Sequence, residues 1–124
     1  MTSILIIDAH PDRRAGIRSI IRRRGMQIWE AASGHDALAL VGGRKFQVVI
    51  VDMEPPDMDG LRLLRRVRFL GRPAAIIALC RIRDAQQIRS LIKAGAISVL
   101  DRESPVSYMR EQINNILICP AAVY

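Results

Sequence analysis

The sequence predicts an α/β domain in which a parallel sheet is covered by helices on both faces. Short aliphatic runs alternate five times with segments whose apolar residues recur at helical spacing. The strand-like runs are apolar on successive residues, as expected for strands that are buried on both faces. The chain has 124 residues and is 50% hydrophobic, which is enough for one core without disulfides or metals.

Five runs are expected to form the strands of this sheet. They are short and aliphatic, and turn or charged residues bound the strongest of them. The runs are Ile4–Ile7, Met26–Ala31, Val48–Val51, Ala75–Leu79 and Ile97–Leu100, of which the second and fifth are weaker. Because each run is followed by a helix-period segment, the strands should be parallel and joined by right-handed crossovers.

The first two helices are recognised by their apolar residues and their ends. The first has an apolar face and is expected to end at Gly25. The second is predicted over Asp36–Val41, because Ser33 lies three residues before Asp36 as in a capping box. The apolar face of the first helix consists of Ile17, Ile20 and Ile21.

The last three helices are also recognised by their end residues and their apolar faces. The third ends at Gly71 and the fourth at Gly95, while the fifth opens with Ser104 as N-cap and Pro105 at the first helical position. Their apolar faces are Leu63, Leu64, Val67 and Leu70 in the third, Ala85, Ile88, Leu91 and Ile92 in the fourth, and Val106, Met109, Ile113, Ile116 and Leu117 in the fifth.

Two aspartates follow strands that should lie side by side. For five strands we expect the flavodoxin-like order 2-1-3-4-5, in which ligands bind where the strand order reverses, between strands one and three. Asp8 and Asp52 end these two strands. Two neighbouring carboxylates repel each other unless a cation or a proton lies between them, and Mg²⁺ is a natural occupant. The alternative is that each aspartate caps a helix or a turn.

The segment around Asp52 resembles the phospho-acceptor segment of response-regulator receiver domains. It reads VVIVDMEPPDMDG: an apolar strand, the acceptor aspartate, three residues, a proline, one residue and Met-Asp-Gly. The opening ILIIDAHP is similar to the first strand and acidic pair of that family, and Gly95-Ala96 matches the Gly-Ala before its fifth strand. The resemblance covers residues 3 to 118. It implies a single receiver domain over 1–118 with a C-terminal tail over 119–124.

What the resemblance implies is phosphotransfer rather than turnover catalysis. Asp52 would attack the phosphorus carried on a histidine of a histidine kinase or phosphotransfer protein and become an aspartyl phosphate. Mg²⁺ and a cationic side chain supply most of the catalysis in such a transfer. The implied metal ligands are Asp8, Asp52 and the backbone carbonyl of Glu54, and Arg102 takes the place of the family's phosphate-binding lysine.

Several positions depart from the family's pattern. Ala9 replaces the second acid of the acidic pair, so Mg²⁺ is expected to bind weakly. The family's Thr or Ser after the fourth strand is Cys80 when counted back from the Gly-Ala pair, and Ala78 when counted forward from the preceding proline; we prefer Cys80. Val99 stands where the family has an aromatic switch residue. These departures support an alternative, a degenerate receiver that binds protein partners without phosphorylation.

The charge of the chain is strongly basic and comes almost entirely from arginine. The formal net charge is +7, and seventeen of the nineteen basic residues are Arg. Either codon usage in a GC-rich genome or an acidic partner accounts for this bias. Ten arginines fall on two helices, which the resemblance to receiver domains places on one face, and this surface would suit an acidic kinase or phosphotransfer protein. They are Arg13, Arg14, Arg18, Arg22, Arg23 and Arg24 on the first helix, and Arg62, Arg65, Arg66 and Arg68 on the third.

The sequence also bears on dimerisation, nucleic-acid binding and cellular location. The family's usual dimer surface, formed by the fourth helix, fifth strand and fifth helix, is a candidate homodimer interface. Nucleic-acid binding is not expected, since the sequence predicts no helix-turn-helix, aromatic stacking platform or basic arm.

The longest uncharged apolar stretch, Ala74–Cys80, is far too short to span a membrane. The cysteines form no CxxC motif and no signal peptide is evident, so we expect a cytoplasmic protein.

Overall fold

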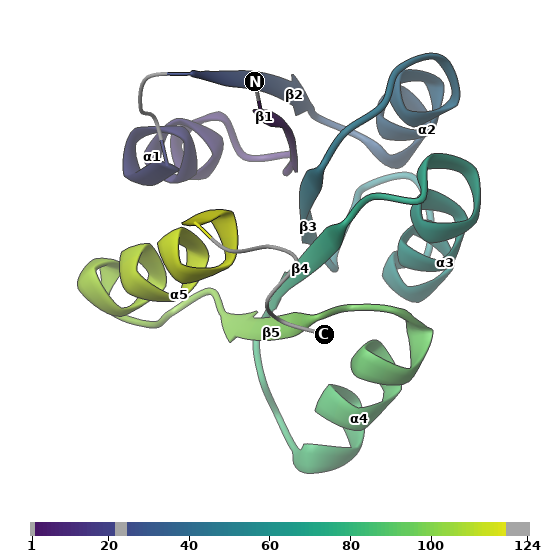
Figure 1. The fold of residues 1–124 in the computed structure, drawn as a ribbon. Coiled ribbons are helices and arrows are strands. Elements are labelled where there is room, and N and C mark those ends of the chain that lie inside the picture. Colours follow the sequence, from purple (N-terminus) through teal and green to yellow (C-terminus); the bar gives the residue numbers. More distant parts are fainter. Residues whose placement is uncertain (1, 22–24, 119–124) are drawn as a thin grey trace.

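A computed structural model describes residues 2–21 and 25–118, and within them five strands alternate with five helices (Figure 1). The strands are β1 (Thr2–Ile7), β2 (Met26–Ala31), β3 (Val48–Asp52), β4 (Ala75–Cys80) and β5 (Ser98–Asp101). The helices are α1 (Pro11–Ile21), α2 (Gly34–Gly43), α3 (Gly60–Gly71), α4 (Ala85–Ala94) and α5 (Val106–Ile118). Every predicted element is present, with strand and helix ends displaced by one or two residues: α2 extends beyond the predicted Asp36–Val41 at both ends, and α5 begins one residue after Pro105. The predicted end of the first helix at Gly25 follows residues 22–24, which lie outside the described residues. The tail over 119–124 lies outside the described residues.

The strand order is β2-β1-β3-β4-β5 and all neighbouring strands are parallel, which confirms the predicted flavodoxin-like fold. In each central strand, successive side chains pack into two hydrophobic cores on opposite faces of the sheet. In β1, Leu5 and Ile7 pack toward α2, α3 and α4, whereas Ile4 and Ile6 pack toward α1 and α5. The continuous apolar runs in the sequence therefore reflect strands that are covered on both sides (Figure 1). None of the described helices is long and apolar enough to cross a membrane.

The expectation that the first and third helices share a face is wrong. α1 and α5 cover one side of the sheet, and α2, α3 and α4 cover the other (Figure 1). The chain crosses from β1 to β2 in one direction and from β3 to β4 in the opposite direction. Because both crossovers are right-handed, the reversal moves the connecting helix to the other face. The arginines of α1 and α3 thus form no common surface, and Arg22, Arg23 and Arg24 lie outside the described residues.

Four residues that were assigned to apolar helix faces are exposed, one of them the small Ala85 at the start of α4. Leu70 is 43% exposed, Ile92 52% and Val106 58%. Leu70 and Val106 lie in the last turn of α3 and the first turn of α5, and Ile92 follows the buried Leu91 on α4. Helical spacing identifies which residues share a stripe, but the width and length of the covered stripe depend on the sheet beneath it.

Candidate functional site

The carboxyl ends of β1, β3 and β5 bring Asp8, Asp52 and Arg102 to one crevice. The backbone ladder continues beyond the strands and fixes where each of these segments leaves the sheet. The hydrogen bonds run from the Asp8 amide to the Ala31 carbonyl (3.0 Å), from the Met53 amide to the Leu79 carbonyl (2.9 Å) and from the Arg102 amide to the Cys80 carbonyl (2.9 Å). The crevice therefore lies at the predicted reversal of strand order.

A guanidinium group lies between the two aspartates. Asp8 and Asp52 are each only 1% exposed, and they are the buried charged residues of the described chain. Arg13, from the first turn of α1, donates through Nε and Nη2 to both carboxylate oxygens of Asp8, with the Nη2–Oδ1 bond at 3.0 Å. The same Nη2 donates to Asp52 Oδ2 at 3.1 Å. The Asp8 hydrogen bond raises the pKa of the Arg13 guanidinium, which is therefore a permanent cation.

Arg102 provides a second cation on the other side of Asp52. Its Nη1 donates to Asp52 Oδ1 at 2.9 Å, and its Nη2 donates to Glu54 Oε1 at 2.9 Å. Both oxygens of the Asp52 carboxylate thus face a guanidinium, one from Arg13 and one from Arg102. Burial still raises the pKa of Asp52, because desolvation and the nearby Asp8 outweigh the two arginines. The Asp52 anion is the form that could act as a nucleophile.

The side chains present fit a divalent metal poorly. With Ala9 in place of an acid, only Asp8 and Asp52 line the crevice as buried carboxylates, and Arg13 bridges them. Within residues 2–21 and 25–118, no cluster of three His, Cys, Asp or Glu residues could hold a metal. No buried side-chain polar atom of that part lacks a hydrogen-bond partner. A hard cation would have to displace Arg13 to reach both carboxylates.

Cys80 is the last residue of β4, opposite Asp101 of β5, whereas Ala78 lies two residues inside the strand, opposite Val99. Cys80 thus has the position at the carboxyl edge that the preferred alignment expects. Its thiol is buried, and burial together with Asp101 raises its pKa. A protonated, buried thiol is neither a thiolate nucleophile nor a strong hydrogen-bond donor. Its role as the switch position stays a prediction.

The loop that follows Asp52 is held to the start of α2. Asp57 accepts hydrogen bonds from the backbone amides of Gly34 (2.8 Å) and His35 (2.9 Å), and its carboxylate also contacts the His35 ring. Anions at a helix N-terminus are stabilised by the free amides and the helix dipole. These contacts lower the pKa of Asp57 to about 2.

Asp57 should stabilise the fold only at pH values where it is ionised. Its pKa is lowered from 3.8 in the unfolded chain to about 2, so the contribution is fully present above pH 3.8 and is lost as the pH falls toward 2. Asp57→Asn should lower the melting temperature at neutral pH, and the difference from the wild type should shrink between those pH values. Thermal melts across this range measure it. A constant difference down to pH 2 would contradict the assignment.

Residues 4–114 match the family model described as the response regulator receiver domain. The chain belongs to that family. Receiver domains are phosphoryl-accepting signalling domains of two-component phosphorelays rather than turnover enzymes, and they generally bind Mg²⁺ at their acidic pocket. Their interaction partners are histidine kinases or phosphotransfer proteins.

Individual relatives agree with the family assignment. A Pseudomonas aeruginosa protein named as a transcriptional regulator is 29% identical over 124 residues, which are 99% of this chain and 56% of that protein. Sporulation initiation phosphotransferase F of Bacillus subtilis is 25% identical over 114 residues, covering 92% of each chain. The receiver domain thus spans about half of the first relative and nearly all of the second.

The fold is also that of solved receiver structures. A CheY-like receiver domain protein from Methanospirillum hungatei superposes with a TM-score of 0.83 at 23% identity, covering 97% of this chain and 96% of that one. At this identity the likeness shows the fold. The arrangement of five parallel strands and five helices is therefore shared with that structure.

Sequence reasoning missed Arg13 as a residue of the crevice. It lies five residues after Asp8 and was grouped with the solvent-facing arginines of α1. The signal that could have identified it is the combination of a missing acid at Ala9 with a long cation one helical turn beyond it. Arg14 and Arg18 were likewise assigned to a free surface, but both pair with Glu30 on β2, at 2.9 Å and 3.1 Å.

Proposed function

We propose that Asp52 of this receiver accepts the phosphoryl group from the phosphohistidine of a histidine kinase or phosphotransfer protein. The observation that carries the proposal is the placement of its carboxylate at the reversal of strand order between Arg13 and Arg102. An Asp52 oxygen attacks phosphorus, the P–N bond of the phosphohistidine breaks, and the imidazole leaves with its proton. The product is an acyl phosphate.

The two arginines would supply the charge neutralisation that the transfer requires. A phosphoryl group in transfer carries negative charge on three oxygens, so catalysis depends mainly on positioned cations. The Arg102 side chain is only 12% exposed and is tied to both Asp52 and Glu54, which fixes its guanidinium beside the nucleophile. A planar guanidinium binds two phosphoryl oxygens at once, whereas a lysine ammonium acts as a point charge.

In this receiver Mg²⁺ would bind weakly, through Asp8, Asp52 and the backbone carbonyl of Glu54. Ala9 contributes no side-chain oxygen, and Arg13 competes for the same two carboxylates. We expect phosphorylation to depend less steeply on Mg²⁺ than in receivers that have both acids. The fixed guanidinium groups would then provide part of the positive charge that a metal supplies in those domains.

Phosphoryl acceptance is tested by intact-protein mass spectrometry. Incubation with a cognate histidine kinase and ATP, or with acetyl phosphate and Mg²⁺, should add the mass of one phosphoryl group. Asp52→Asn should abolish this gain, because the amide is not a nucleophile. Asp12→Asn removes an exposed carboxylate in the first turn of α1, one residue before Arg13, and should leave the gain unchanged. No gain with any donor would overturn the proposal and favour a receiver that acts without phosphorylation.

The output surface is proposed to be the face formed by α4, β5 and α5, with homodimerisation as one of its uses. Exposed apolar side chains lie there: Ile92 on α4, and Val106 and Tyr108 on α5, the last 48% exposed. Val99 of β5 lies where the family has an aromatic switch residue. Because valine has no ring to reorient, phosphorylation of Asp52 would have to change this face through shifts of the backbone. Direct nucleic-acid binding by this domain is not proposed. The cytoplasmic location stays a prediction.

A further inference from the structure

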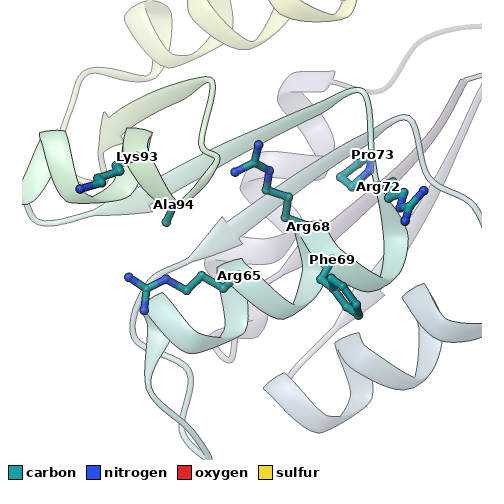
Figure 2. A pocket seen from close by; sticks show the side chains of 7 residues that line it. All are labelled: Arg65, Arg68, Phe69, Arg72, Pro73, Lys93 and Ala94. Carbon is teal, nitrogen blue, oxygen red and sulfur yellow. The ribbon is translucent and has the colours of Figure 1, made fainter.

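A basic groove runs between α3 and α4. One stretch has a volume of about 550 Å³ and is lined by Arg65, Arg68, Phe69 and Arg72 of the α3 side and by Lys93 of α4 (Figure 2). An adjoining stretch of about 580 Å³ shares Arg65 and Lys93 and adds Arg89. We call the two stretches together the α3–α4 groove. No carboxylate lines either of them.

The cations form two rows along the walls. Arg65, Arg68 and Arg72 follow one another at spacings of three and four residues on α3 and its C-cap, and Arg89 and Lys93 are four residues apart on α4. All five side chains are exposed. At 1.5 Å per residue the α3 row extends about 10 Å along the helix. Figure 2 shows Arg65 and Arg68 reaching from α3 toward α4.

These cations have no acidic partner in the described part of the chain. The arginines that form ion pairs there are those of α1 and of the loops around the crevice, among them Arg13 and Arg102. Helix dipoles explain cations near the ends of α3 and α4, but Arg65 and Arg89 lie in mid-helix. Like charges at these spacings destabilise a free helix. The arrangement is therefore better suited to a bound anion than to the isolated domain.

The Arg68 side chain passes close to the end of α4. Its side chain lies across Gly95, where an added Cβ would come within 2.4 Å of Arg68 Cδ. Gly95 has φ 124° and ends α4 through its amide hydrogen bonds to Leu91 and Ile92. The absence of a side chain at Gly95 therefore allows the Arg68 stem to cross from α3 to the end of α4.

We propose that the α3–α4 groove binds an acidic helical segment of a partner protein. Carboxylates three and four residues apart on one face of a helix repeat at the spacing of the cations on α3, and each guanidinium can bind a carboxylate through two hydrogen bonds. The two walls are themselves helices, so a third helix can lie in the hollow between them. Phe69, 75% exposed at the rim, provides an apolar contact. A nucleic-acid duplex is convex and wide, and the groove offers it no protruding element.

Binding of a synthetic acidic helix tests the proposal. The probe is a fluorescein-labelled, alanine-rich peptide of about 16 residues, long enough to be partly helical, with glutamates alternately three and four residues apart. Fluorescence anisotropy is measured at low salt for the wild type and three variants. Arg65→Glu and Arg89→Glu change one wall each, and each should weaken binding about tenfold or more. Arg66→Glu makes the same charge change on α3 outside the groove lining and should stay within about twofold.

Circular dichroism shows whether each variant is folded. Because Arg65→Glu and Arg89→Glu lie on different helices, the test remains valid if one of these two variants fails to fold. Equal weakening by all three variants would show a response to net charge alone and overturn the proposal. Equal binding of a peptide with glutamine in place of glutamate would overturn it as well. Tighter binding of a DNA oligonucleotide that is lost in Arg65→Glu would assign the groove to nucleic acid instead.

Discussion

Arg13→Ala is expected to raise the affinity of this receiver for Mg²⁺ by at least about tenfold. In the wild type the Arg13 guanidinium bridges Asp8 and Asp52, the two carboxylates that a metal would need. Two unit charges 4 Å apart interact by about 4 kcal/mol at an effective dielectric constant near 20. A tenfold gain needs only about 1.4 kcal/mol. Isothermal titration of the purified domain with Mg²⁺ measures the change.

Arg18→Ala is the matched control for this titration. It removes the same side chain from the same helix, but Arg18 pairs with Glu30 rather than with the aspartates of the crevice. Its Mg²⁺ affinity should equal that of the wild type. Ala9→Asp restores a charged oxygen ligand and should also raise the affinity, most of all in combination with Arg13→Ala. Unchanged affinity in Arg13→Ala would show that Arg13 does not compete with the metal.

Gly60→Ala is expected to destabilise the domain by about 3 kcal/mol, because the new methyl group has no room. A Cβ at Gly60 would lie 2.0 Å from the backbone oxygen of Met53, and a backbone atom cannot move aside as a flexible side chain can. Met53 follows Asp52 directly, so relief of the clash would displace the acceptor as well. Chemical denaturation should show the loss of stability, and the phosphorylated fraction should fall in parallel.

Gly16→Ala provides the opposite control. Gly16 lies inside α1, and apart from its own chain neighbours and helix backbone no atom lies within 4 Å of an added Cβ. Alanine at a helix interior position is favoured over glycine by roughly 0.5–1 kcal/mol, so this variant should be slightly more stable than the wild type. If Gly60→Ala were as stable as the wild type, the close approach of α3 to the Met53 carbonyl would be wrong.

The fold could be predicted from the sequence because the residues of each strand segment indicate a strand on their own. Val48–Val51 is a short, β-branched run that is apolar on successive residues, and this pattern indicates a strand covered on both faces. The alternation with helices then requires parallel crossovers. The error lay in the side on which α3 packs, although the predicted strand order and right-handed crossovers together place α1 and α3 on opposite faces of the sheet. Ile92 was misassigned because helical spacing does not show how wide a stripe the sheet covers.

The site could be predicted only for residues attached to strand ends. Asp8, Asp52 and Arg102 leave the sheet at positions that the strand order determines, and the structure brings them together. Arg13 reaches the same crevice from a helix through a long side chain. Helical periodicity assigns such a residue to the solvent face, and only the position of its guanidinium in three dimensions shows that it bridges two buried carboxylates.

Chemical mapping of the phosphorylated residue tests the proposed function most directly. Borohydride reduces an aspartyl phosphate to homoserine, which peptide mass spectrometry then locates. After incubation with a phosphodonor, the modification should appear at Asp52 and at no other carboxylate, and it should persist when Mg²⁺ is reduced to low concentrations. Modification at Asp8, Asp57 or Asp59 in place of Asp52, or the absence of any modified peptide, would contradict the account.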